Sequence, residues 1–331
     1  MPFENLKKTE INKLNLALFI LYTFLALVAV FIPMLGVAGI ILLPIPATIL
    51  IAGERIRDGI ICAIVGCIAL VFMDFSLMLV MAILVIAISF IYKGSIGKDR
   101  SKLFTIGYIF TVFCIAAVLY ILINSLVYRI NFIDEFIKNY NASIDIIFGD
   151  EFFLAYTGLF PADESQLKSI LEQLRNILEF MLYIVPGFSI FLCFFISVIN
   201  YMATSRVLVK YGINLEPLKS FKDWDVPWYY CWTVIVGLIL VLIPFNNQSL
   251  DNIANITGFN LLIIFGSIYF ILGISVIWSL MEKFKVSLAW RIIIFILIAL
   301  FLGFMIFILS FMGLIDVWVN FRKLERGRQP A

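Results

Sequence analysis

The sequence predicts an all-α fold, a polytopic integral membrane helical bundle of about eight or nine transmembrane helices with additional amphipathic external helices. Of the 331 residues, 63% are hydrophobic and only 14% are charged. Soluble domains have about 45–50% apolar and about 25% charged residues. The mean hydropathy is +1.08. The apolar residues also form long runs, and a run of about 20 residues is enough to cross a bilayer as a helix.

Nine apolar runs are candidate spans. The second run is separated from the first only by Pro33 and Met34, and it contains Pro44 and Pro46. Proline at membrane depth frees backbone carbonyls, which need a neighbouring helix or a cavity as partner. This break is therefore either a packing kink or part of a binding site. The runs are Leu14–Ile32, Leu35–Ala52, Gly59–Met73, Phe75–Tyr92, Leu103–Leu126, Ile177–Ala203, Trp228–Phe245, Thr257–Leu280 and Ala289–Val319.

The long segment between the fifth and sixth runs predicts two amphipathic helices. Apolar residues recur at helical spacing from Ile130 to Ile147 and again from Leu167 to Leu178. Such helices lie on the membrane surface or cover the mouth of a ligand site. The chain thus divides into an N-terminal transmembrane half (1–128), an external amphipathic segment (129–177) and a C-terminal transmembrane half (178–331).

The distribution of lysine and arginine predicts that the N-terminus is on the cytoplasmic side of the membrane. Cytoplasmic loops carry an excess of these residues, and in this orientation the inside segments hold sixteen of the 24. Nine crossings would place the basic tail, with Arg322, Lys323, Arg326 and Arg328, outside. Eight crossings would return it to the cytoplasm, and the sequence leaves both counts open.

Several classes of function are not expected from the composition. The chain has no histidine, which is the commonest proton shuttle near neutral pH and the commonest metal ligand. None of its five cysteines forms a CxxC pair, and neither a P-loop nor a GxSxG motif is present. A net charge of +2 is too small to indicate nucleic-acid binding. We therefore expect no enzyme activity, no cofactor, no metal site and no nucleic-acid partner.

Charged residues between the early runs are the first candidate polar positions. Glu54 and Arg55 follow the second run, and Arg55 can reach Asp58 three residues later on a helix. A charged cytoplasmic turn and a functional cluster are both open interpretations. Asp74 is the single charge between two apolar runs. It is expected in a turn at the outer interface, or facing a polar cavity in contact with a cation or substrate.

A second group of candidates lies in residues 200–230. Asn200 is in the last turns of a run, and Arg206 shares a helical face with Lys210, as suits anionic lipid headgroups. Trp224 and Asp225 belong to "FKDWDVPWYY", whose aromatic residues are typical of an interfacial belt at the entry of the next span. Because acidic residues separate the tryptophans, docking of a partner protein stays open as a second interpretation.

The C-terminal stretch "FMGLIDVWVNFRKLERGR" contains three further candidates, Asp316, Asn320 and Arg322. Asp316 and Asn320 share a helical face, whereas Asp316 and Arg322, six residues apart, do not. We therefore do not expect a direct pair within the helix. A carboxylate at this depth is unfavourable alone, so Asp316 needs a partner on another helix or a polar cavity.

Two of these stretches together resemble the YybS-like family of bacterial polytopic membrane proteins, known as domain of unknown function DUF2232. The resemblance rests on two motifs. In the first, a span ends in an Asn and a basic stretch, and a short loop then runs to a Pro. In the second, the last span closes with Gly-Leu-x-Asp and an aromatic residue, followed by an end rich in Arg and Lys. A weaker match is "LPIPATILIAGERIRDG". The matching positions are Asn200, Arg206, Pro227, Gly313, Leu314, Asp316, Trp318, Arg322 and Lys323.

The family is in turn similar, at the level of the fold, to the S-components of energy-coupling-factor transporters. That similarity implies a compact bundle that takes up a small molecule such as a vitamin or its precursor. The alternative is a non-transporting scaffold of the cell envelope that recruits partners at the membrane. Partners expected from the sequence are the lipid bilayer with its anionic headgroups, and either a small-molecule ligand or a membrane protein.

Overall fold

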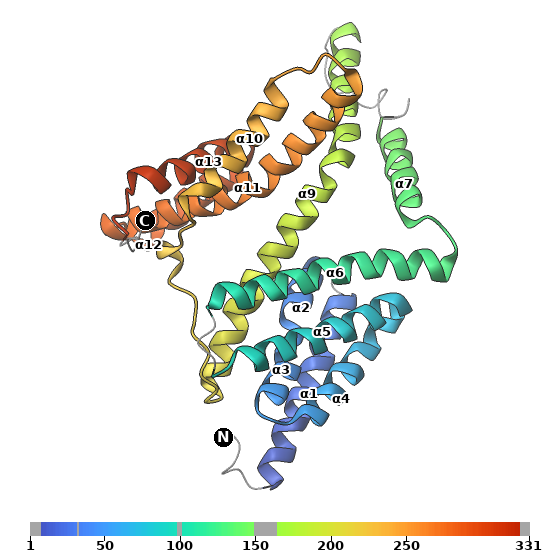
Figure 1. Ribbon diagram of the computed structural model, residues 1–331, viewed down its shortest axis with the longest axis vertical. Coiled ribbons are helices and arrows are strands. Elements are labelled where there is room, and N and C mark those ends of the chain that lie inside the picture. Colours follow the sequence, from blue (N-terminus) through green and yellow to red (C-terminus); the bar gives the residue numbers. More distant parts are fainter. Residues whose placement is uncertain (1–7, 32, 98–100, 149–163, 325–331) are drawn as a thin grey trace. The chain divides into compact units, whose positions relative to one another are not determined.

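The computed structural model describes residues 8–31, 33–97, 101–148 and 164–324, and every regular element in these ranges is helical (Figure 1). The predicted all-α fold is confirmed for this part of the chain. The elements are α1 (Lys8–Phe31), α2 (Pro33–Leu42), α3 (Pro44–Ala52), α4 (Ile56–Cys67), η1 (Ile68–Phe72), α5 (Phe75–Ser95), α6 (Lys102–Tyr128), α7 (Phe132–Ile147), α9 (Glu164–Lys210), η2 (Phe221–Asp223), η3 (Trp228–Tyr230), α10 (Cys231–Leu242), α11 (Gln248–Lys283), α12 (Leu288–Leu300) and α13 (Leu302–Val319).

Five of these helices are long and apolar enough to cross a membrane: α5, α6, α9 from Ser169 onward, α11 and α13. Four shorter apolar helices lie in α1, α2–α3, η3–α10 and α12. Each predicted run therefore contains helix, although the runs are divided differently from the prediction. Large apolar side chains are exposed along most of these helices, as expected where lipid replaces water.

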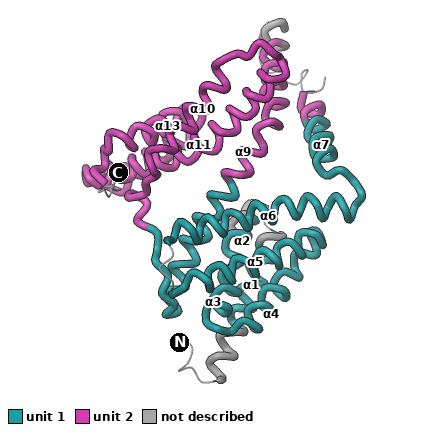
Figure 2. Tube along the Cα trace, viewed as in Figure 1, with its two compact units in different colours: residues 1–143, 192–218 teal, residues 144–191, 219–331 magenta. Residues whose placement is uncertain are grey.

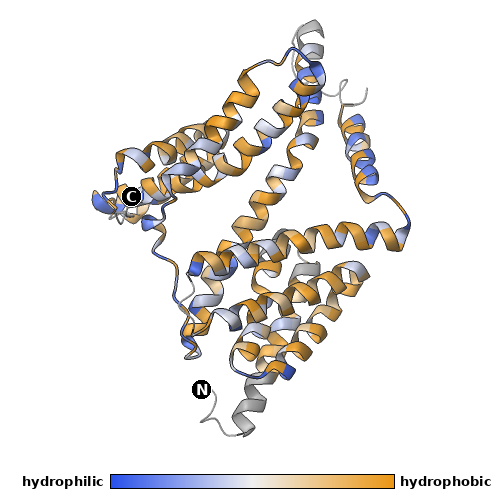
Figure 3. Cartoon of the chain, viewed as in Figure 1, coloured by the Kyte–Doolittle hydropathy of each residue, from blue (hydrophilic) through white to orange (hydrophobic). Residues whose placement is uncertain are grey.

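Two predicted elements are joined in α9. The amphipathic stretch 167–178 and the run 177–203 form one helix of 47 residues that contains Pro186. Figure 3 shows hydrophilic residues near its beginning and on α7, and mostly hydrophobic residues along the other long helices. The second amphipathic helix is thus the first part of a membrane helix, because no residue between them ends the helical hydrogen bonding.

The chain forms two compact units, coloured separately in Figure 2. Unit 1 contains residues 1–143 and 192–218, and unit 2 contains residues 144–191 and 219–331. The long helix α9 contributes to both. Each candidate site discussed below is formed within one unit.

In the core of unit 1, a small residue and short polar side chains lie where the helices contact one another. The ring of Tyr22 lies against Gly66, where a Cβ atom would be only 1.5 Å from a ring carbon. The Tyr22 hydroxyl is 3.2 Å from the sulfur of Cys67. Between α3 and α5, the hydroxyls of Thr48 and Ser89 are 3.0 Å apart. Small residues thus let these helices approach closely, and the hydroxyls of Thr48 and Ser89 hydrogen-bond where α3 meets α5.

In unit 2, the predicted single span Ala289–Val319 is wrong. It consists of two helices, α12 and α13, with Phe301 between them at φ −106° and ψ 30°. These dihedral angles lie outside the α-helical region, which ends the first helix. The sequence does not predict the break because the residues around Phe301 are all apolar, the run contains no proline, and its first glycine, Gly303, comes after the break.

The direction of α13 follows from its contacts with α11. The hydroxyl of Ser310 donates to the carbonyl of Gly266, and Arg322 at the end of α13 donates to Ser275. Because residue numbers rise together along the contact, the two helices run parallel, as Figure 1 also shows. Since α12 starts beside the end of α11, the chain must reverse direction at Phe301. Residues 320–324 consequently lie on the same side as the C-terminal end of α11.

Helices α11 and α13 are packed backbone against backbone. A Cβ atom on Gly273 would lie 2.0 Å from the carbonyl oxygen of Leu309, and one on Gly313 would lie 2.1 Å from that of Tyr269. The sequence places Gly266 and Gly273 on one face for close packing. Gly273 lies at such a contact, whereas a Cβ on Gly266 would meet nothing within 4 Å.

Candidate functional site

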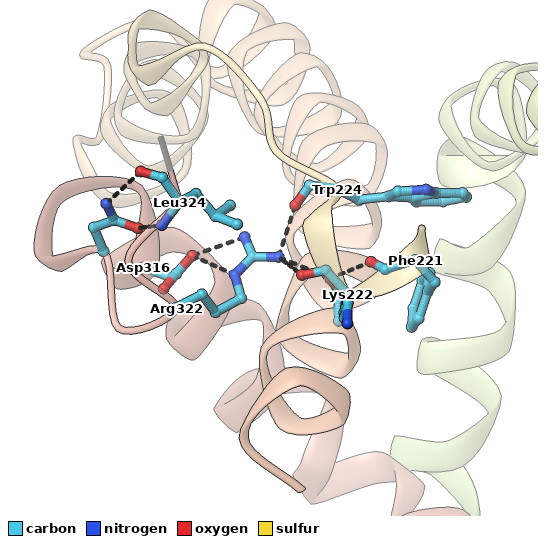
Figure 4. Close-up of polar contacts among 8 residues, drawn as sticks. Phe221, Lys222, Trp224, Asp316, Arg322 and Leu324 are labelled. Carbon is cyan, nitrogen blue, oxygen red and sulfur yellow. Dashed lines mark hydrogen bonds and ion pairs between the residues drawn. The ribbon is translucent and has the colours of Figure 1, made fainter. Parts of the chain in front are cut away.

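A buried ion pair joins Asp316, near the end of α13, to Arg322 just beyond it (Figure 4). The Nε and Nη2 atoms of Arg322 donate to the same carboxylate oxygen at 3.0 and 2.8 Å. Both side chains are only 1% exposed. A direct pair is not expected within a continuous helix, but α13 ends at Val319 and Arg322 lies beyond it. Asp316 thus pairs with a residue just past its own helix, where the sequence predicts a partner on another helix or a polar cavity.

The pair forms because the helix ends between its two members. Asn320 has left-handed backbone angles, φ 52° and ψ 55°, and its N–H donates to the carbonyl of Asp316. Asparagine is one of the few residues that adopt this conformation readily, and it often ends a helix this way. The Asn320 amide also donates to Leu324 and accepts from its N–H, at 2.9 and 2.8 Å. The chain thus folds back and returns Arg322 to Asp316.

The remaining guanidinium nitrogen of Arg322 holds a loop that is distant in sequence. Its Nη1 atom donates to the carbonyls of Lys222 and Trp224 at 2.9 and 2.8 Å, and to the hydroxyl of Ser275 at 2.8 Å. Ser275 in turn donates to the carbonyl of Phe221 at 2.6 Å. An arginine has five N–H donors, and here every guanidinium nitrogen bonds within the chain. We call Asp316, Arg322 and Ser275 with loop 219–224 the Arg322 clamp.

The loop held by the clamp is itself ordered by its side chains. The indole N–H of Trp224 donates to the carbonyl of Lys219 at 3.1 Å, and its ring contacts Phe221 at a centroid distance of 5.1 Å. Lys222 bonds to Glu282 of α11 at 2.9 Å, and this hydrogen bond raises the pKa of Lys222 above its usual value. The loop is thus tied to α11 by its backbone and by its side chains.

The aromatic residues of "FKDWDVPWYY" divide into two groups. Trp224 packs against the small core of unit 2 formed by Tyr269, Leu272 and Val317. Trp224 is thus half-buried against protein, and the interfacial belt stays a prediction for the remaining part of its ring. Trp228, Tyr229 and Tyr230 are exposed, as a belt requires, and Asp225 is exposed beside them.

Unit 1 contains a second buried polar contact, centred on Asn200 of α9. Its amide donates to the carbonyl of Ile41 at 2.7 Å and accepts from the hydroxyl of Tyr92 at 2.9 Å. Asn200 and Tyr92 are fully buried. Ile41 lies in the last turn of α2, just before the break at Pro44. Asn200 therefore gives one carbonyl beside the break a partner on another helix, whereas the carbonyls that lose a donor to Pro44 and Pro46 are those of Ile40 and Leu42.

The remaining candidates lie at turns and on the surface of unit 1. Glu54 has left-handed backbone angles and accepts from Lys93 at 2.7 Å. The ion pair between Arg55 and Asp58, anticipated from their spacing, is present. Arg206 is exposed on α9.

Asp74 caps the N-terminus of α5, as the turn interpretation anticipated. Its carboxylate accepts from the N–H of Ser76 at 3.1 Å and from the hydroxyl of Tyr128 at 3.2 Å. Partial burial acts to raise the pKa of Asp74, but the hydrogen bonds outweigh it and the pKa is lowered.

The roles of Ser275 and Tyr92 are not predicted from the sequence. A signal exists for each, because a hydroxyl within a long apolar run needs a partner when it is buried. That signal does not identify the partner, since the partners are 47 and 108 residues away in sequence.

The comparisons with known proteins agree with this architecture. A family of predicted membrane proteins, DUF2232, matches residues 20–317. The chain is 24% identical over 322 residues to the uncharacterized protein YybS of Bacillus subtilis (strain 168), covering 96% of this chain and 99% of that protein. No solved structure gives a significant match. The chain is a multi-pass membrane protein and belongs to the DUF2232 family.

Proposed function

We propose that this protein is a non-catalytic scaffold of the bacterial cytoplasmic membrane, which presents loop 219–224 to a partner protein. The observation that carries the proposal is the Arg322 clamp. Small-molecule sites keep a few polar groups available for the ligand, whereas every guanidinium nitrogen of Arg322 donates within the chain. An arrangement of this kind fixes a surface loop in one conformation, which is what recognition by a partner needs.

The distribution of charge supports a cytoplasmic position for loop 219–224. The tail and loop 219–224 are joined through Arg322, and both contain lysine or arginine, which favours the cytoplasmic side. Cysteines introduced at Ser220 and Lys323 should therefore react with a membrane-impermeant thiol reagent only in inverted vesicles. Labelling of either residue from outside intact cells would contradict this orientation.

The scaffold role is tested by site-specific photo-crosslinking in cells. A crosslinking amino acid at Lys219, an exposed loop position, should give one discrete adduct with a partner protein. In an Arg322→Gln background, the adduct should fall several-fold relative to the amount of inserted protein measured in the membrane. The matched control is the same amino acid at Lys138, an exposed residue of α7. An adduct at Lys219 that is indifferent to Arg322 would refute the proposal.

Small-molecule uptake of the S-component type is the second candidate, and one observation favours it. The broken run α2–α3 resembles the broken helices that line binding sites in some transporters. One carbonyl of this run, that of Ile41, already accepts a hydrogen bond from the amide of Asn200. A thermal-shift screen of the purified protein against vitamins and their precursors tests this function. A ligand that raises Tm in a saturable manner, and loses its effect in Asn200→Ala, would favour uptake over the scaffold.

A further inference from the structure

The turn between α11 and α12 exposes large apolar side chains between cationic ones. Phe284, Leu288 and Trp290 are 71%, 72% and 63% exposed. Lys283 and Lys285 are also exposed, and neither has an ion-pair partner in the described ranges of the chain. We call these five residues the α11–α12 turn surface.

Lys285 lies at a backbone position of this turn where glycine is usually found. The N–H of Val286 donates to Met281 at 2.9 Å and that of Lys285 to Glu282 at 3.0 Å, which is the Schellman pattern of a helix end. In this motif the residue at the Lys285 position adopts left-handed angles, and its φ is +51°. Glycine is favoured there because a side chain strains this conformation. Lys285 adopts this conformation despite the strain.

The third cation of the turn has a structural role. The Nε atom of Arg291 donates to the carbonyl of Val286 at 2.9 Å, and its guanidinium carbon lies 5.4 Å from the ring centroid of Trp278. Arg291 thus fixes the turn to α11 through a hydrogen bond and a cation–π contact. The ammonium groups of Lys283 and Lys285 are therefore available to a binding partner outside the chain.

We propose that the α11–α12 turn surface binds the headgroup of an anionic phospholipid. A lysine ammonium is a compact charge that suits a lipid phosphate, and exposed Phe and Trp side chains sit favourably at the boundary between headgroups and acyl chains. The turn lies at the end of a membrane helix, and the exposed Phe321 and Lys323 of the tail are on the same side of unit 2. Charge complementarity therefore selects an anionic lipid rather than a zwitterionic one.

Native mass spectrometry of the full chain tests the proposal. The protein is released from micelles containing equal amounts of phosphatidylglycerol and phosphatidylcholine, and the retained lipids are counted. We expect a preference for phosphatidylglycerol that falls about fivefold in Lys285→Gly and by about the same factor again when Lys283→Gln is added, since each basic residue near an anionic surface contributes about that factor. Lys138→Gln, which removes an exposed charge elsewhere, should leave the preference unchanged.

Lys285→Gly separates lipid binding from folding. Because glycine relieves the left-handed strain, this variant should unfold at the same temperature as the wild type or higher. Equal retention of both lipids by the wild type would overturn the proposal, leaving ordinary bilayer contact. An unchanged preference in Lys285→Gly would overturn it as well. If that variant accumulates poorly, Lys285→Asn gives the same test, because asparagine also tolerates this conformation.

Discussion

Breaking the Arg322 clamp should destabilise the protein far more than breaking a surface ion pair. Arg322→Met keeps most of the side-chain volume but removes the guanidinium that pairs with the buried Asp316 carboxylate. Removing one member of a buried ion pair typically costs about 3–5 kcal/mol. For a domain of about 150–250 residues, 1 kcal/mol corresponds to roughly 2–4 °C in Tm. We therefore expect the Tm of the detergent-solubilised protein to fall by about 6–20 °C.

A double-mutant cycle distinguishes the ion pair from a general packing defect. Asp316→Asn alone leaves the guanidinium buried without a counter-charge, whereas Asp316→Asn combined with Arg322→Met leaves no buried charge. The double variant should therefore be more stable than the sum of the two single losses predicts, by at least about 1–2 kcal/mol. Losses that add within about 0.5 kcal/mol would refute the reasoning.

An exposed arginine provides the matched control. Arg175 in α9 bonds to Asp145 at 2.6 Å and to Glu179 at 2.9 Å, but all three side chains are well exposed. Exposed pairs of this kind contribute little, because water and salt screen them. Arg175→Met should leave Tm almost unchanged. A loss as large as that of Arg322→Met would show that the count of hydrogen bonds, and not burial, sets the effect.

Further substitutions test three other parts of the structure in thermal unfolding experiments. Gly273→Ala should lower the free energy of unfolding by about 1–3 kcal/mol, because α11 and α13 must move apart. Gly266→Ala is the control and should be neutral or slightly stabilising, because a Cβ atom there meets open space. Equal losses of stability in the two variants would contradict the close packing of α11 and α13. Asn200→Leu should cost about 2–4 kcal/mol, since two buried polar groups lose their partner, and a neutral effect would mean that the α2–α3 break does not need it. Asp74→Ala should cost about 1 kcal/mol at pH 7 through the lost helix cap. Because the pKa of Asp74 is lowered in the folded state, the stability contributed by its charge is present above the ordinary aspartate pKa of about 4 and is lost as the pH falls through the folded value. The gap between wild type and Asp74→Asn should therefore close on acidification, and a gap that widens would refute the assignment.

The sequence predicts helices well here because in a membrane an apolar run leaves the backbone few alternatives. Hydrogen bonds within a helix satisfy the backbone where no water is present, so Phe75–Tyr92 and Leu103–Leu126 correspond closely to α5 and α6. Breaks are harder to predict. The break before Pro44 has a local cause in the missing N–H group, whereas the one at Phe301 lies in a stretch with no local signal and depends on tertiary packing.

The sequence identifies several residues of the candidate site but not the contacts between them. Asp316 stood out because a carboxylate next to an apolar run needs a partner. The sequence does not predict its pairing with Arg322, because a helix that continues past Asn320 would place the two side chains on different faces. An asparagine after an apolar run is nevertheless a known signal of a helix end. The carbonyls of Lys222 and Trp224 could not be anticipated at all, since every residue has such a group and only the tertiary fold selects two of them.

The sequence separation of the clamp also sets the order in which it forms. Arg322 is 98 residues from Trp224 and 47 from Ser275, so loop 219–224 and α11 are synthesised well before the arginine that joins them. Until α13 is in place, Ser275 and the loop carbonyls lack that donor, and buried polar groups without partners are unfavourable in a membrane. Insertion of α12 and α13 therefore completes unit 2 rather than merely extending it. A chain that stops at Val319 keeps every membrane helix of unit 2 but lacks Arg322, and it should unfold like Arg322→Met.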